Sequence, residues 1–269
     1  MKKSLSILFV SLVVFSSCTE VMDDFDLNTA EPKIVVDASV SPQKAQVILS
    51  KTTSYLNPNN VPYISGATVY LSFNDMQLSL NEDSAGYYSA TMNFPEETTY
   101  ELNVLIGKEN IHATSYMPKV TLWDSLTVQK SEFADWIPAE MMDSTKTLYD
   151  VLAYMTDIKS VVNYYKVDIW HADTLLSRSV TDDGYFDGQA IQLVTLMGAY
   201  SSTDTLRLYL SSIDKAAFEF YNTLALSNSS SGMFSAPDNP ISNLEGDALG
   251  RFYAYAIDSL YVMFPEEEK

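Results

Sequence analysis

Three aspartates in the second half of the chain have the spacing best suited to bind a metal ion. Asp182 and Asp183 precede a glycine, and Asp187 follows within the stretch 182–188. Carboxylate oxygens are hard ligands of the kind that Ca²⁺ prefers. The spacing is not that of an EF-hand loop, and Asp and Gly also favour turns between strands. We therefore expect a turn, with a calcium site at these three aspartates as the alternative.

Residues for nucleophilic or zinc chemistry are scarce. The chain has two histidines, His112 and His171, and one cysteine, Cys18. The G-x-S-x-G sequence of a serine nucleophile does not occur. Among 35 acidic residues, some pair at glycosidase spacing is expected by chance. We therefore expect no enzyme activity, no catalytic residue and no cofactor, and rank a surface hydrolase third among the hypotheses.

The net charge narrows the range of partners. With 16 basic and 35 acidic residues, the formal charge is −19 at pH 7. Such a balance argues against nucleic acid or an anionic lipid face as a partner, because both repel an acidic protein. Charged residues are 19% and apolar residues 46% of the chain, as in ordinary globular proteins.

The N-terminus has the organisation of a secretory signal. Lys2 and Lys3 precede the apolar run 5–15, which is too short for a transmembrane helix of about 20 residues. The stretch 15–18, Phe-Ser-Ser-Cys, resembles a bacterial lipobox, although leucine is usual at its first position. That resemblance implies cleavage before Cys18 and lipidation of its sulfur. An ordinary signal peptide with an accidental cysteine, or a buried first helix, is the alternative.

We therefore expect a signal peptide at 1–17 and an acidic tether at 18–30 that begins with lipidated Cys18. Removal of the first segment changes the net charge from −19 to −21. Acidic residues just after the cysteine resemble the surface-export signal of Bacteroidetes lipoproteins. The predicted location is the outer membrane, lipid-anchored and facing the exterior. A merely solvated linker is the alternative for the tether.

The predicted fold is all-β, with two β-sandwich-like domains in tandem. Domain 31–118 contains seven runs with strand character. Its sequences Ser65–Leu71, Gly86–Tyr88 and Thr99–Leu102 resemble a carboxypeptidase-regulatory or Ig-like module, which carries no catalytic residue. The runs are Ile34–Val36, Val47–Leu49, Ala67–Phe73, Gln77–Leu80, Tyr87–Thr91, Tyr100–Ile106 and Asn110–Tyr116.

Domain 119–265 combines strands with one amphipathic helix near 214–226. Apolar residues there recur at steps of three and four, Asp214 is a candidate N-cap, and Ile213 with Phe218 a candidate hydrophobic staple. An acidic tail, 266–269, follows. The expected strands are Leu126–Lys130, Leu148–Met155, Asn163–Trp170, Gln189–Leu196, Thr205–Ser211, Arg251–Ile257 and Leu260–Phe264.

Several short sequences together resemble the DUF4249 family of Bacteroidetes lipoproteins, over about 31–264. They are Glu31–Val36, Tyr116–Pro118, Asn163–Val167, Phe186–Gln189 and Pro237–Gly246. No function is assigned to that family. Its genes often lie beside those of outer-membrane TonB-dependent transporters, and the resemblance therefore implies an accessory role at a transporter.

Loops rich in aromatic residues and methionine are the candidate contact surfaces. Trp136, Met141 and Met142 lie in the stretch 133–142, and Tyr55 and Tyr63 flank a segment rich in Asn and Pro. Such side chains on loops suit binding surfaces. The alternative for 133–142 is that it folds back over one end of the sandwich.

Taken together, these features predict a non-catalytic lipoprotein. We expect an accessory or ligand-capture partner of a TonB-dependent transporter. An adhesin or structural cell-surface protein is the alternative, because an Ig-like block also suits a protein that stands off from the cell.

Overall fold

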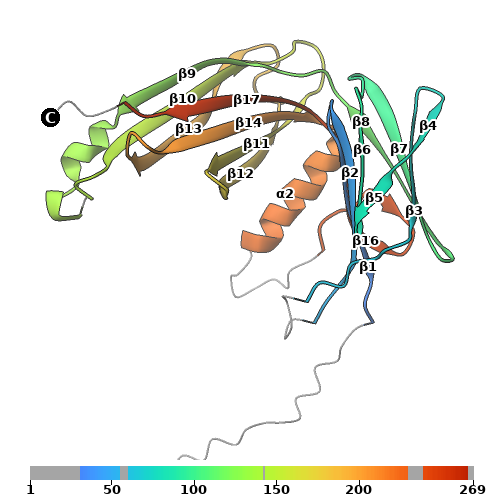
Figure 1. The fold of residues 1–269 in the computed structure, drawn as a ribbon. Helices are drawn as coiled ribbons and strands as arrows, with labels where there is room; N and C mark the ends of the chain where they lie inside the picture. Colours follow the sequence, from blue (N-terminus) through green and yellow to red (C-terminus); the bar gives the residue numbers. More distant parts are fainter. Residues whose placement is uncertain (1–30, 55–59, 142, 230–238, 266–269) are drawn as a thin grey trace, which may run out of the picture. The chain divides into compact units, whose positions relative to one another are not determined.

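The computed structural model describes residues 31–54, 60–141, 143–229 and 239–265. By its contacts the chain divides into two units, Met1–Glu31 and Pro32–Lys269, and the fold shown in Figure 1 belongs to the second. Three residues singled out in the sequence, Cys18, Tyr55 and Met142, lie outside the described residues, as do the signal peptide, the tether and the acidic tail.

Two five-stranded sheets form the N-terminal sandwich (Figure 1). The first has the order β16–β1–β2–β6–β5, made of Ala248–Ala254, Ile34–Val40, Lys44–Lys51, Tyr87–Thr91 and Asn81–Ser84. The second has the order β15–β8–β7–β3–β4, made of Leu244–Glu245, Glu109–Met117, Thr98–Ile106, Thr68–Phe73 and Met76–Ser79.

Two further sheets form the C-terminal sandwich, which is joined by the α-helix α2 (Lys215–Ser229). One sheet has the order β13–β10–β9, made of Ala190–Tyr200, Thr147–Thr156 and Trp123–Lys130. The other, called the inner sheet below, has the order β12–β11–β14–β17, made of Thr174–Asp182, Tyr164–His171, Thr205–Ile213 and Ala256–Met263. Two 3₁₀ helices, η1 (Glu132–Trp136) and η2 (Ala139–Met141), connect β9 to β10.

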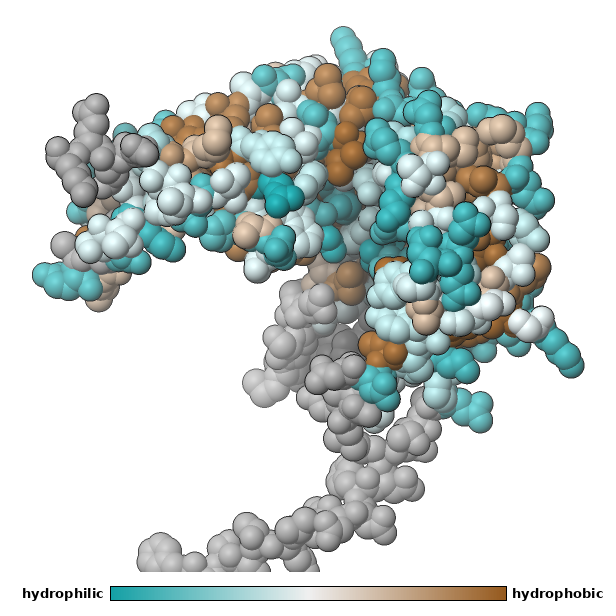
Figure 2. Space-filling model, in the orientation of Figure 1, coloured by the Kyte–Doolittle hydropathy of each residue, from teal (hydrophilic) through white to brown (hydrophobic). Residues whose placement is uncertain are grey.

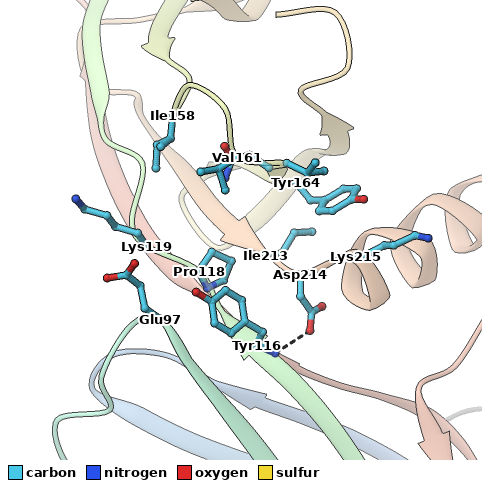
Figure 3. A pocket seen from close by; sticks show the side chains of 12 residues that line it. Glu97, Tyr116, Pro118, Lys119, Ile158, Val161, Tyr164, Ile213, Asp214 and Lys215 are labelled. Carbon is cyan, nitrogen blue, oxygen red and sulfur yellow. Dashed lines mark hydrogen bonds between the residues drawn. The ribbon is translucent and has the colours of Figure 1, made fainter. Parts of the chain in front are cut away.

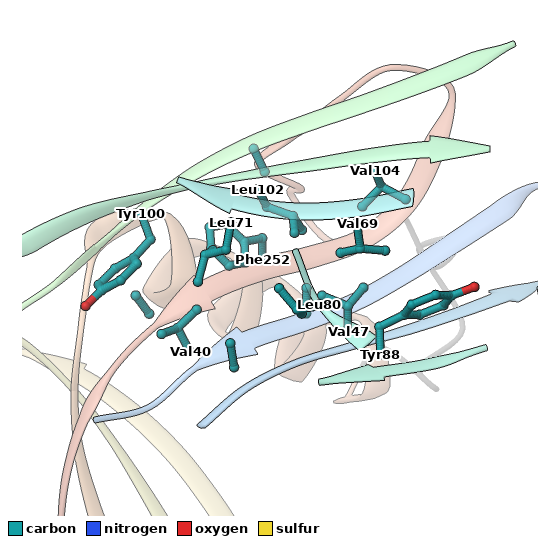
Figure 4. Packing of buried hydrophobic residues seen from close by; sticks show 14 of the residues in the cluster. Val40, Val47, Val69, Leu71, Leu80, Tyr88, Tyr100, Leu102, Val104 and Phe252 are labelled. Carbon is teal, nitrogen blue, oxygen red and sulfur yellow. The ribbon is translucent and has the colours of Figure 1, made fainter. Parts of the chain in front are cut away.

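The core of the N-terminal sandwich is apolar and follows from strand alternation. In β7, Tyr100, Leu102 and Val104 are buried, and the residues between them are more exposed. They pack with Val69 and Leu71 of β3 and with side chains of the opposite sheet (Figure 4). The buried hydroxyl of Tyr100 donates to the carbonyl of Pro95 at 2.7 Å, so even this polar atom is satisfied.

The chain from β16 to β17 serves both sandwiches. β16 pairs in parallel with β1, and after Tyr255 the chain continues into β17, which pairs with β14 of the inner sheet. The backbone N–H of Tyr255 donates to the carbonyl of Val40 at 2.9 Å. At Gly250 the backbone φ is +111°, and a Cβ would lie 2.0 Å from the carbonyl oxygen of Val36. Only glycine fits this close approach.

The all-β class with one amphipathic helix, predicted from the sequence, is confirmed. Asp214 caps α2 as expected, since its Oδ1 accepts from the N–H of Ala217 at 2.8 Å. Three strands escaped prediction. Most residues of β5 and β12 are exposed and lack an apolar alternation, and β15 is only two residues long. The structure also differs from the expected division at 118/119. β15 and β16 fall in the range 119–265 but complete the sheets of the N-terminal sandwich.

None of the helices among the described residues is both long and apolar enough to cross a membrane. In the orientation of Figure 2, apolar side chains form small patches separated by hydrophilic ones.

Candidate functional site

The contact residues expected from the sequence lie on different sandwiches. Trp136 and Met141 are on η1 and η2, where their side chains are 81% and 79% exposed. Tyr63 lies beside β2, where it bridges to Ser50, and its hydroxyl accepts from that of Tyr87 at 2.9 Å. The described residues of the two loops therefore do not combine into one site. The loop 132–141 projects at one end of the C-terminal sandwich (Figure 1).

The predicted calcium aspartates are only partly brought together. Asp183 and Asp187 meet Asp157, with one oxygen of each within 4.8 Å of the others. Asp182 instead accepts from the N–H of Gly184 at 3.0 Å, as a turn requires.

Hydrogen bonds within the chain account for this acidic cluster. Asp157 accepts from the N–H of Gly188 at 2.8 Å and from the hydroxyl of Tyr165 at 2.5 Å. Asp183 accepts from the N–H of Asn163 at 2.9 Å, and Asp187 from that of Ser160 at 2.6 Å. The three carboxylates thus fasten two turns to each other.

The two histidines have separate partners. Nδ1 of His112 on β8 lies 3.8 Å from Oε2 of Glu245. Nε2 of His171 on β11 lies 2.8 Å from Oδ1 of Asp204. Hydrogen bonds from Ser201, with the contact to His171, lower the pKa of Asp204 to about 2. The histidines belong to different sheets.

One pocket lies between the two sandwiches and is mainly apolar (Figure 3). It has a volume of about 240 Å³ and is lined by Tyr116, Ile158 and Ile213 among others. Beside it, Asp214 Oδ2 accepts from the hydroxyl of Ser115 at 2.6 Å and from the N–H of Tyr116 at 2.9 Å. Burial raises the pKa of Asp214 although these bonds oppose the shift. Asp214 therefore joins β8 to the start of α2. Its buried carboxylate beside the pocket is thus explained by a structural role.

A larger cleft, of about 420 Å³, opens on the face of the inner sheet that looks away from the core of its sandwich. Alternation creates it: Tyr165, Val167 and Ile169 of β11 face the core, so the residues between them face the cleft. We call it the arginine cleft. Its lining is Lys166, Asp168, Trp170, Ala172, Asp173, Arg207, Tyr209, Ser211, Tyr253, Tyr255 and Ile257.

The strand register fixes which lining residues are neighbours. Between β11 and β14, Lys166 is opposite Ser211, Asp168 opposite Tyr209 and Trp170 opposite Arg207. Side chains opposite each other on one face of an antiparallel pair lie within contact distance. Charged, hydroxyl and aromatic groups therefore meet on one face of two strands.

A buried ion network forms part of the wall of the cleft. Asp168 Oδ2 accepts from Lys166 Nζ at 2.5 Å, and both side chains are less than 10% exposed. Arg178 on β12 donates to both oxygens of Asp168, at 2.6 and 3.1 Å. Burial lowers the pKa of Lys166 despite the nearby carboxylate. For Asp168, burial alone would raise the pKa, but the bonds from Arg178 and Lys166 outweigh it and lower the pKa.

Aromatic rings surround these cations. The guanidinium of Arg251 lies 4.8 Å from the ring centre of Tyr221 and 5.3 Å from that of Tyr253. Arg178 lies 5.3 Å from the Tyr221 ring, and Lys166 lies 5.5 Å from it. Cations over aromatic faces are stabilised when they are shielded from water. Burial raises the pKa of Tyr253 and Tyr255, so both keep their hydroxyl protons at neutral pH.

Some polar atoms at this site lack a partner. The hydroxyl of Ser211 and Nε of Arg251 are buried without a hydrogen bond. The guanidinium of Arg251 also forms an ion pair with Asp37, at 3.1 Å. Buried polar atoms are rarely left unpaired. A cleft with perturbed titratable groups and unpaired polar atoms has the features of a binding site.

Sequence reasoning did not identify the arginine cleft. Its one local signal is Lys166-Val167-Asp168 in an otherwise apolar strand, where opposite charges two residues apart share a face. Arg207 and Arg251 belong to other strands, and only the sheet order and the turn into β17 bring them near.

The sequence profile of the family DUF4249, described as a domain of unknown function, matches residues 22–260. No curated protein matches the chain.

Proposed function

The chain belongs to the DUF4249 family, and we propose that it is a non-catalytic lipoprotein of the outer-membrane surface. In this proposal it is anchored by lipid on Cys18 and captures a small ligand for a TonB-dependent transporter.

The arginine cleft is the observation that carries the proposal. Its volume, about 420 Å³, lies in the range of small-molecule sites, which run from about 300 to 1,000 Å³. Trp170, Tyr209 and Tyr255 supply flat apolar surfaces, and Arg207 supplies directional donors. This combination favours capture of a ligand over a purely structural role.

The exposed loop 132–141 supports a docking role. Phe133, Trp136 and Met141 are each more than half exposed. Aromatic and methionine side chains on a projecting loop are typical anchors of protein interfaces. In the proposal this loop contacts the transporter, while the cleft holds the ligand.

The test is a pull-down from solubilised outer membrane with a C-terminal tag. Four forms are compared: the wild type, Cys18→Ala, Trp136→Ala and Met76→Ala. The last is the matched control, because Met76 is 49% exposed but lies on a hairpin of the other sandwich. We expect a TonB-dependent transporter to co-purify in stoichiometric amount with the wild type and with Met76→Ala. Less transporter should co-purify with Trp136→Ala, and Cys18→Ala should be absent from the membrane fraction.

Two results would contradict the proposal. If the wild type reaches the membrane but brings down nothing above Cys18→Ala, the transporter role is wrong. Self-association of the purified protein, or its binding to host matrix proteins, would favour the adhesin or structural alternative. If all membrane-bound forms recover the transporter equally, the role stands but loop 132–141 is not its contact.

A further inference from the structure

The distribution of arginine in the chain is uneven. The sequence contains three arginines, Arg178, Arg207 and Arg251. Arg207 lines the cleft, Arg178 holds Asp168 in its wall, and Arg251 lies over Tyr253, another lining residue. They come from β12, β14 and β16, so three strands each contribute one to the same region.

The net charge of this region is positive, whereas the net charge of the whole chain is negative. Lys166 and the three arginines face three carboxylates, those of Asp37, Asp168 and Asp173. When all seven groups are ionised, the region has one positive charge in excess, although the net charge of the chain is −19. An anion is repelled by most of such a surface, and a cleft with low-dielectric walls concentrates the field of its own charges.

The donors are divided between the mouth and the floor. At the mouth, partly exposed Arg207 lies opposite Trp170, with Tyr209 two residues along the same strand face. A planar guanidinium beside aromatic rings suits a carboxylate attached to a ring. At the floor, Lys166 is opposite Ser211, whose hydroxyl has no partner. The floor thus adds positive charge and a free hydroxyl, four residues along the two strands from Trp170 and Arg207.

We propose that the arginine cleft binds a small organic anion in which a carboxylate is attached to a ring. This inference rests on the ligand-capture function proposed above and names the class of ligand. The carboxylate is held by Arg207 at the mouth, in the positive field of Lys166 further along the strands, and the ring stacks against Trp170 and Tyr209.

The experiment is isothermal titration of the full chain, purified in detergent, with two matched pairs of probes. Benzoate is compared with benzamide, and glucuronate with glucose, so that each pair shares a ring and differs in the carboxylate. We expect at least one acid to bind about tenfold or more tightly than its neutral partner. A charge-assisted hydrogen bond that the neutral partner cannot form accounts for a difference of this size.

Two variants locate the effect. Arg207→Gln should remove the preference for the acid over its neutral partner, because the amide keeps a donor but loses the charge. Lys215→Gln is the control, since Lys215 is an exposed cation on α2, outside the cleft. It should bind like the wild type.

The outcomes separate this inference from the proposed function. Equal binding of acid and neutral partner, lost in Trp170→Ala, would overturn the anion preference but keep ligand capture. A preference that survives Arg207→Gln would show that the anion binds elsewhere. If none of the probes binds at millimolar concentration, the ligand class is wrong, and the pull-down alone then decides the proposed function.

Discussion

The core of the N-terminal sandwich and the arginine cleft are both made of strands with buried faces, but their side chains differ. The first is a continuous set of apolar residues with satisfied tyrosine hydroxyls. The second buries ions: Lys166 and Asp168, both in its lining, are two of the four buried charged side chains among the described residues, and the other two, Asp157 and Asp183, belong to the acidic cluster of the same sandwich.

The contrast indicates where stability and recognition are made. Burial of apolar surface stabilises a fold by about 25 cal/mol per Å². A buried ion pair is close to neutral or unfavourable compared with apolar side chains of similar volume. The apolar cores of the two sandwiches therefore account for stability. The ion network at the cleft has little stabilising value of its own, which is consistent with a role in binding.

The largest loss of unfolding free energy is expected in β16, which belongs to the N-terminal sandwich and also contributes Arg251 and Tyr253 beside the cleft. Gly250→Ala should cost more than about 3 kcal/mol of unfolding free energy, because left-handed backbone strain of about 1–3 kcal/mol adds to overlap with the Val36 carbonyl. Urea unfolding followed by circular dichroism measures it. Gly107→Ala is the control, since Gly107 also has a positive φ but open space around it, and should cost about 1 kcal/mol. Equal losses would show that the close approach is unimportant.

Removal of the central carboxylate of the ion network should lower the free energy of unfolding nearly as much. Asp168→Leu leaves Lys166 and Arg178 without their shared partner, and breaking a buried pair in this way costs about 3–5 kcal/mol. Asp247→Ala breaks the exposed pair with Lys33 and should cost less than about 1 kcal/mol. Chemical unfolding of both variants makes the comparison. A small loss for Asp168→Leu would mean that the network is more hydrated than its burial indicates.

Truncation in the N-terminal core tests the apolar side of the comparison. Leu102→Ala should cost about 2–5 kcal/mol, through lost burial and the cavity that remains. Leu105 on the same strand is 42% exposed, and its alanine variant should cost less than about 1 kcal/mol. The affinity of the cleft for the acid probes should be unchanged in Leu102→Ala, as titration can verify. Altered affinity would show that the two regions are coupled.

An apolar replacement within the network should barely change stability. In Lys166→Met, Asp168 is still held by both bonds from Arg178. We expect the free energy of unfolding to stay within about 1 kcal/mol of the wild type, or to rise. Affinity for the acid probes should fall, because the floor loses its positive charge. Thermal unfolding and titration of the same preparation measure both, and a large loss of stability would contradict the division of roles.

Acid should affect the C-terminal sandwich through its hydrogen-bonded carboxylates, with the smallest effect of the series. The pKa of Asp204 is about 2 in the folded protein, below its ordinary value of 3.8. A lowered pKa means that its contribution to stability is present above pH 4 and is lost as the pH falls towards 2. Melting temperatures between pH 5 and pH 2 should therefore fall less steeply for Asp204→Asn. Parallel curves would exclude this contribution.

The sequence by itself determined the class of the fold and much of its detail. Alternation located most strands of both sandwiches, and the pairing of Asp214 with a periodic apolar run located α2 and its cap. These features depend on neighbours close in the chain, which is why a local pattern predicts them. The sequence left open whether Trp136 and Met141 lie on a contact loop or fold back over the sandwich, and the structure shows both side chains exposed.

Only the tertiary structure decided the membership of the sheets and the composition of the cleft. β15 and β16 join the N-terminal sandwich from more than 100 residues away, and no local pattern specifies a partner at that distance. Asp157, rather than Asp182, meets Asp183 and Asp187 because two turns approach each other in space. The three arginines lie far apart in the sequence, and only the order of strands and the turn into β17 gather them around one cleft.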